Sequence, residues 1–96
     1  MVETLNDESI RGWVGGREGW KQSGQTLTKE FRFTSFRNSI VFVNRVASLA
    51  DDVDHHPDID IRYTTVSLTL TTHEANGLTQ KDLDLAERID FATSAR

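Results

Sequence analysis

The chain has 96 residues, of which 36% are hydrophobic and 27% are charged, as is typical of one globular domain. It contains no cysteine, which excludes disulfide bonds, thiolate metal sites and a cysteine nucleophile. Its net charge of -4, with basic residues spread along the chain, argues against nucleic-acid binding. Since there is neither a signal-peptide pattern nor a run of about 18 apolar residues, we expect one cytoplasmic domain over residues 1–96, without a membrane partner.

A short helix and a β-hairpin are predicted first. Asn6 is a suitable N-cap residue, apolar residues recur after it at helical spacing, and the glycine pair at 15–16 ends the pattern. Segments 19–23 and 26–33 flank the turn-like pair at 24–25. Apolar residues in the second segment share one parity, which indicates a hairpin with one buried face.

A longer helix is predicted from Ser35 to Asp52, because apolar residues there form two stripes at helical spacing. The stripes comprise Phe36, Ile40, Val43, Ala47 and Ala50, and Phe42, Val46, Leu49 and Val53. Together they cover about half of the helix circumference, more than the roughly 100° that packing on one layer requires. We therefore expect helix 35–52 to contact a second surface, most simply another copy in a homodimer or homotetramer.

Two strands are predicted next. Apolar residues fall at odd positions from Ile59 to Tyr63 and at even positions from Val66 to Leu70. Because a shift of one residue moves every side chain to the other face, this change of parity requires a turn or bulge near Tyr63 and Thr64.

The last predicted element is a helix that begins at a capping box. Thr79 can act as the N-cap residue, Asp82 stands three positions later, and Leu78 can pack against Leu83. The resulting order, α-β-β-α-β-β-α, predicts an α+β fold in two layers, with helices on one face of a four-stranded antiparallel sheet.

The three histidines of the chain all fall at the ends of predicted elements. His55 and His56 follow the long helix, and His73 ends the second strand pair. An antiparallel return of that strand would bring His73 back towards the other two. Histidine exchanges a proton near neutral pH, so such a cluster suits acid-base chemistry. Asp51, one helical turn before His55, could accept a hydrogen bond from a ring nitrogen and fix its tautomer.

Other interpretations of these residues remain open. A histidine near a loop is often a surface or capping residue, and acidic residues at the end of a helix are often only solvated. Three histidines can also hold zinc, copper or iron. Adjacent residues such as His55 and His56 tend to point apart, however, and no zincin-type pair occurs at helical spacing. We therefore predict no metal site.

One pattern covers nearly the whole chain. Its central part begins with Asp51-x-x-x-His55-His56-Pro57 and continues with Tyr63, His73, Gly77-Leu78-Thr79 and Asp82. The residues that extend it are Trp20, Phe31-x-Phe33-x-x-Phe36, Val46-Ala47, Leu85-Ala86 and Ile89-Asp90. This pattern resembles the pterin-4a-carbinolamine dehydratases. The resemblance implies the same four-stranded fold and dehydration of 4a-hydroxytetrahydropterin to quinonoid dihydropterin without a cofactor. In this family the reaction regenerates the cofactor of aromatic amino acid hydroxylases.

The resemblance also implies roles for individual residues. His55, His56 and His73 would form the catalytic set, with His55 and His73 as acid-base groups and His56 orienting the pterin. Substrate binding or orientation would involve Asp51, Pro57, Tyr63, Thr72 and Asp82. Asp51 stands where the family often has glutamate. The alternative is a non-catalytic binding or assembly factor, because some dehydratase-like proteins assist assembly of Rubisco; the presence of all three histidines favours the enzyme.

Overall fold

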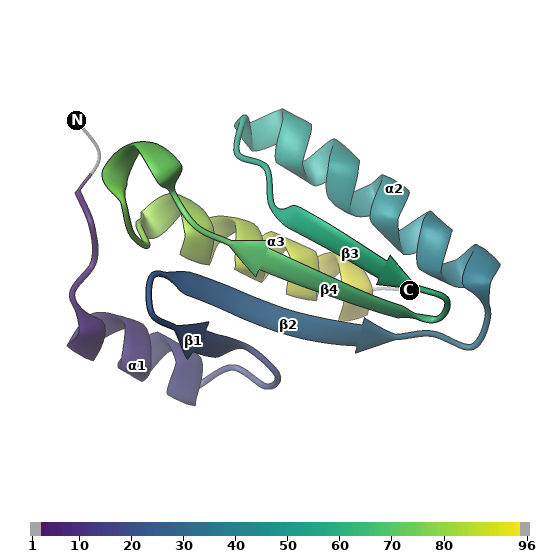
Figure 1. Ribbon diagram of the computed structural model, residues 1–96, viewed down its shortest axis with the longest axis horizontal. Coiled ribbons are helices and arrows are strands. Elements are labelled where there is room, and N and C mark those ends of the chain that lie inside the picture. The colour runs from purple at the N-terminus through teal and green to yellow at the C-terminus, as the bar shows by residue number, and fades with distance from the viewer. Residues whose placement is uncertain (1–2, 95–96) are drawn as a thin grey trace.

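The computed structural model describes residues 3–94 and confirms the α+β class and the predicted element order (Figure 1). One four-stranded antiparallel sheet has the strand order β1-β2-β4-β3. Within residues 3–94, none of the helices combines the length and apolar character that crossing a bilayer requires. The elements are α1 Asp7–Gly15, β1 Lys21–Ser23, β2 Thr26–Arg32, α2 Phe36–Val53, β3 Asp58–Arg62, β4 Thr65–Leu70, the 3-10 helix η1 His73–Ala75, and α3 Gln80–Ser94.

The predicted helix starts are confirmed by their capping hydrogen bonds. The side chain of Asn6 accepts a bond of 2.8 Å from the backbone N–H of Ser9. At the start of α3, the backbone N–H of Thr79 donates to the Asp82 carboxylate at 2.9 Å, which is one half of the predicted capping box. The Thr79 hydroxyl accepts from the N–H of Lys81 instead of Asp82. Each bond satisfies a donor that the first turn of a helix leaves unpaired.

The change of parity between the third and fourth strands is confirmed as a tight turn. Tyr63 adopts the left-handed conformation, with φ of 54°, between the end of β3 and the start of β4. Ile61 is thereby paired with Val66 across an antiparallel ladder. Directly paired residues share a face of the sheet, so the odd and even positions point the same way on the two strands.

Three strand ends differ from the prediction. β2 ends at Arg32 instead of residue 33. β1 begins at Lys21 instead of residue 19, because Gly19 has a φ of 92°, which is incompatible with a strand. β4 ends at Leu70, before His73, which was expected at the end of this strand pair. Beyond it, Thr72 forms a single antiparallel bridge with Gly77, and the chain between them turns through η1.

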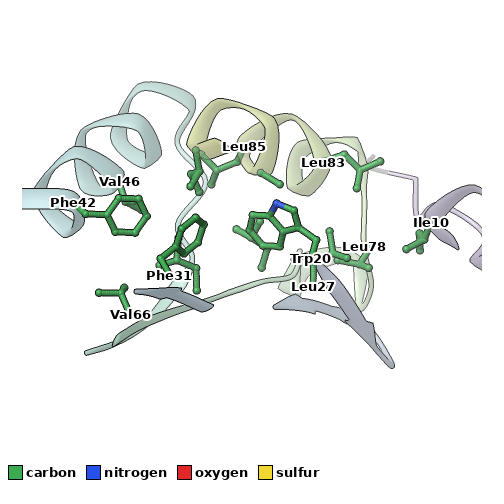
Figure 2. Packing of buried hydrophobic residues seen from close by; sticks show 14 residues of the cluster. Ile10, Trp20, Leu27, Phe31, Phe42, Val46, Val66, Leu78, Leu83 and Leu85 are labelled. Atoms are coloured by element: carbon green, nitrogen blue, oxygen red, sulfur yellow. The ribbon is translucent and has the colours of Figure 1, made fainter. Parts of the chain in front are cut away.

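The core lies between the sheet and the helices that cover one of its faces (Figure 2). β4 shows the expected alternation, with every second residue fully buried. In Figure 2, residues from α2 and α3 meet the sheet from above, and Ile10 of α1 lies at the right-hand side. The buried hydrophobic cluster comprises Ile10, Trp20, Leu27, Phe31, Phe42, Val46, Val66, Leu68, Leu70, Leu78, Leu83, Leu85, Ala86 and Ile89.

Lys29 interrupts the apolar pattern of β2, and the structure explains why it is tolerated there. Its ammonium group forms an ion pair of 2.9 Å with Asp90 of α3. It also lies 4.9 Å from the ring centroid of Phe31 and 5.8 Å from that of Trp20. A charge on the inner face of the sheet is therefore paired and covered by aromatic rings.

The two apolar stripes of α2 have different surroundings. The stripe containing Phe42 and Val46 faces the core, where both residues are buried. In the other stripe Phe36 is 48% exposed and Ala47 is exposed, whereas Ile40 and Val43 are half-buried and Ala50 is buried. The long helix therefore packs on the sheet and α3 with one side only.

Candidate active site

The C-terminal turn of α2 directs His55 into the protein. Asp54 adopts the left-handed conformation, with φ of 52°, and ends the helix. The backbone N–H of the next residue, His55, then donates to the carbonyl of Ala50 at 3.1 Å. This pattern reverses the chain and satisfies a carbonyl that the helix end would leave free. The His55 side chain is 8% exposed, whereas His56 remains at the surface.

The η1 turn brings His73 to the same end of the sheet. β3 starts beside the end of α2, and antiparallel β4 returns to that point, as Figure 1 shows. The Thr72–Gly77 bridge then holds the turn that begins at His73. The three histidines line one surface pocket of about 310 Å³. Its lining residues are Asp54, His55, His56, Thr71, His73, Glu74 and Lys81.

His55 forms a buried pair with Asp82. Its Nε2 atom lies 2.6 Å from Oδ1 of Asp82, which is fully buried in the first turn of α3. The second carboxylate oxygen accepts from the Thr72 hydroxyl at 2.7 Å and from the backbone N–H of Thr79 at 2.9 Å. Such a carboxylate fixes the orientation of the imidazole ring that it contacts.

Asp51 pairs with His56, whereas the sequence suggested that it would support His55. The Nε2 atom of His56 lies 2.9 Å from Oδ1 of Asp51. This pair is exposed, with 56% of the His56 side chain and 76% of the Asp51 side chain accessible. The reason is the left-handed turn at Asp54, which directs residue 55 inward and leaves residue 56 beside the helix.

The remaining predicted site residues lie outside the pocket lining. Thr72 is fully buried, so it can orient other groups but cannot contact a substrate in the pocket. Pro57 precedes β3 and does not line the pocket. Tyr63 lies at the far end of β3, where its ring stacks on Phe36 with centroids 6.4 Å apart. Five strand residues at about 3.3 Å each separate Tyr63 from the histidines, which places it outside the pocket of its own chain.

Four pocket residues escaped the sequence analysis: Asp54, Thr71, Glu74 and Lys81. Asp54 and Glu74 are sequence neighbours of the histidines, and this adjacency was the available signal. Lys81 lies in the first turn of α3, beside Asp82, which is paired with His55. The pocket thus combines three imidazoles with groups of both charges. Across the described residues, no group of three or more histidine, aspartate or glutamate side chains has the arrangement of a metal site.

The sequence and the fold match those of known proteins. Residues 3–92 match the family model described as pterin 4 alpha carbinolamine dehydratase. A relative from Roseiflexus sp. (strain RS-1), which carries this family name, is 50% identical over 90 residues, covering 94% of this chain and 97% of its own.

Two solved structures have the same fold. A transcriptional coactivator/pterin dehydratase from Brucella melitensis aligns with a TM-score of 0.87 and 28% identity, covering 92% of this chain and 96% of its own. A pterin dehydratase-like protein identified as a RuBisCO assembly factor in the alpha-carboxysome aligns with a TM-score of 0.66 and 27% identity, covering 77% and 88%. From the family match and the Roseiflexus relative, this chain belongs to the pterin-4a-carbinolamine dehydratase family.

Proposed function

We propose that this protein removes water from 4a-hydroxytetrahydropterin to give quinonoid dihydropterin. One observation carries the proposal: the three histidines line a single pocket in a member of this family. The pocket volume of about 310 Å³ is in the range of small-molecule sites.

The reaction needs two proton transfers and no redox step. A proton is delivered to the 4a-hydroxyl group, the C4a–O bond breaks with release of water, and a proton leaves ring N5. His55 and His73 serve as the acid-base groups in this proposal, because both line the pocket and imidazole exchanges protons near neutral pH. His56, held by Asp51 at the surface, orients the pterin.

A stopped-flow assay tests the activity. Purified protein is expected to accelerate the loss of 4a-hydroxypterin absorbance, and replacing His55 and His73 together by alanine is expected to abolish the acceleration. Circular dichroism of the double variant checks that it remains folded. Wild-type protein that is no faster than buffer would overturn the proposal.

The product suggests a place in cofactor recycling. Reduction of quinonoid dihydropterin restores tetrahydropterin, so the protein would support tetrahydrobiopterin-dependent hydroxylation in the cytoplasm. Loss of the gene is then expected to lower tetrahydropterin, which chromatography of cell extracts would measure.

The alternative is a non-catalytic assembly role, supported by the shared fold of the RuBisCO assembly factor. The histidine pocket favours catalysis, because an assembly surface has no need for imidazoles at a small-molecule pocket. A chain that binds Rubisco subunits in native mass spectrometry, and that fails to dehydrate the pterin, would reverse this preference.

A homo-oligomer formed through α2 is also proposed. The exposed apolar residues of this stripe, Phe36 and Ala47, support an interface with a second copy. Light scattering after size exclusion is expected to show a dimer or tetramer. Ala47→Glu should dissociate it, whereas Ser48→Glu, next to it and outside the stripe, should not. A monomeric wild-type protein would overturn this interface.

A further inference from the structure

The buried hydrogen bonds behind His55 have a fixed direction. The backbone N–H of Lys81 donates to the Thr79 hydroxyl at 3.3 Å. The hydroxyls of Thr79 and Thr72 lie 2.8 Å apart, and that of Thr72 donates to Asp82. Because each hydroxyl has one proton and Thr72 directs its proton at the carboxylate, Thr79 must be the donor to Thr72. The chain therefore runs in one direction, from Lys81 to Asp82.

Asp82 is the common acceptor at the end of this chain. One of its oxygens accepts from the Thr72 hydroxyl and the Thr79 backbone N–H. The other oxygen lies 2.6 Å from Nε2 of His55. An ionised carboxylate can only accept hydrogen bonds, so the proton in this last contact belongs to Nε2 of the imidazole.

The other ring nitrogen of His55 is open to the pocket. The described residues supply no hydrogen bond to Nδ1. In the part of the chain that the structure describes, no buried side-chain nitrogen or oxygen lacks a partner, so Nδ1 cannot be a buried atom. His55 is itself a lining residue of the histidine pocket, which gives Nδ1 an accessible position.

We infer that Thr72 and Thr79 are positioning residues, which hold Asp82 so that His55 keeps its proton on Nε2 and exchanges protons with the substrate through Nδ1. The use of Nδ1 in dehydration rests on the proposed function. The assignment of the His55 tautomer does not depend on that function. If His55 acts as the base, its Nδ1 lone pair takes the proton from pterin N5. If His55 acts as the acid, the imidazolium gives its Nδ1 proton to the 4a-hydroxyl group. In either direction the Nε2 proton stays with Asp82, whose negative charge balances the imidazolium.

Nitrogen NMR tests the tautomer directly, without substrate. The chain has only three histidines, so a long-range proton–nitrogen spectrum of protein labelled with ¹⁵N-histidine can be assigned by replacing them one at a time. With the rings neutral, His55 is expected to show a single tautomer protonated at Nε2. His73 is the internal reference, because it is exposed and the described residues give its ring no hydrogen bond. A proton on Nδ1 of His55, or tautomers mixed as in His73, would overturn the inference.

Three variants test the threonine chain. Thr72→Val removes the hydroxyl and is expected to give mixed tautomers at His55 and about a tenfold lower kcat at unchanged KM, the effect of losing one hydrogen bond to a charged group. Thr72→Ser keeps the hydroxyl and should restore both. Thr69→Val is the matched control, because Thr69 also pairs with a threonine, Thr28 at 3.3 Å, but on the other side of β4. An unchanged His55 spectrum in folded Thr72→Val would overturn the positioning role.

The two proposals fail separately. If wild-type His55 is protonated at Nε2 and no dehydration occurs, the proposed function is wrong and the assigned tautomer stands. If dehydration occurs and His55 has mixed tautomers, the tautomer is wrong and the proposed function stands.

Discussion

Nε2 of His55 lies 2.6 Å from Oδ1 of Asp82, although 27 positions separate the two residues. The contact connects the end of α2 to the first turn of α3 and places a buried carboxylate directly behind the histidine pocket. Asp82 therefore contributes both to the fold and to the orientation of His55.

Asp82→Asn is expected to lower both stability and activity. The variant removes the charge that accepts three hydrogen bonds, so the free energy of unfolding should fall by about 1–3 kcal/mol. Dehydration should slow by roughly 10–100-fold, the usual effect of losing a group that orients a functional histidine. Urea unfolding and the stopped-flow assay measure the two effects. Asp51→Asn is the control, because its pair with His56 is exposed and should change stability by less than about 1 kcal/mol.

Two histidine variants should separate catalysis from stability. His73→Ala is expected to slow dehydration by about 10²–10⁴-fold, as for an acid-base group. Its stability should stay within about 0.5 kcal/mol of wild type, because the His73 side chain is exposed. His55→Ala should lose both activity and stability, since it leaves buried Asp82 without one of its partners. A fully active His73→Ala would contradict the role of this residue.

The helices and strands could be predicted because their signals are local. Asn6 and Thr79 mark helix starts by short hydrogen bonds, and the parity change at Tyr63 forces a turn whatever the rest of the chain does. Gathering the histidines needed one further step, the antiparallel return of β4. That step is a general property of hairpins, so the cluster could also be anticipated.

The partners of the histidines could not be predicted. Asp51 is the nearest carboxylate to His55 in helical spacing, yet the left-handed turn at Asp54 directs His55 towards α3 and leaves Asp51 to His56. Asp82 gave only the local signal of a capping box. Its second role depends on how α3 packs against α2, and no pattern within either segment encodes that arrangement.

Trp20→Phe is expected to destabilise the fold without affecting the pocket. The indole N–H donates to Asp90 at 2.8 Å and the side chain is 2% exposed, so losing this bond to a charged group should lower the free energy of unfolding by about 1.5–3 kcal/mol. Trp13→Phe is the matched control. It loses a similar 2.9 Å bond to Glu87 at an exposed site and should lose less than about 1 kcal/mol. Urea unfolding would contradict the expectation if the two losses were equal.

Glu87 gives stability a predictable dependence on pH. Hydrogen bonds from Trp13 and then from Arg17 lower the pKa of the Glu87 carboxyl below its ordinary value of 4.5; burial opposes them, and the Arg17 charge adds the smallest contribution. A carboxyl whose pKa is lower in the folded state stabilises the fold above its unfolded pKa, and this contribution is lost as the pH falls through the folded value.

Glu87→Gln should therefore lower the Tm at pH 7, and the difference from wild type should shrink in acid as Glu87 becomes protonated. The effect should be modest, because solvent and salt screen the Arg17 pair. Glu18→Gln makes the same charge change at an exposed position and corrects for the altered net charge. Calorimetry at pH 7 and at pH 3 measures the Tm of each variant and of the wild type. A Tm difference that is the same at both pH values would show that the carboxylate charge contributes nothing and that only the shape of the side chain matters.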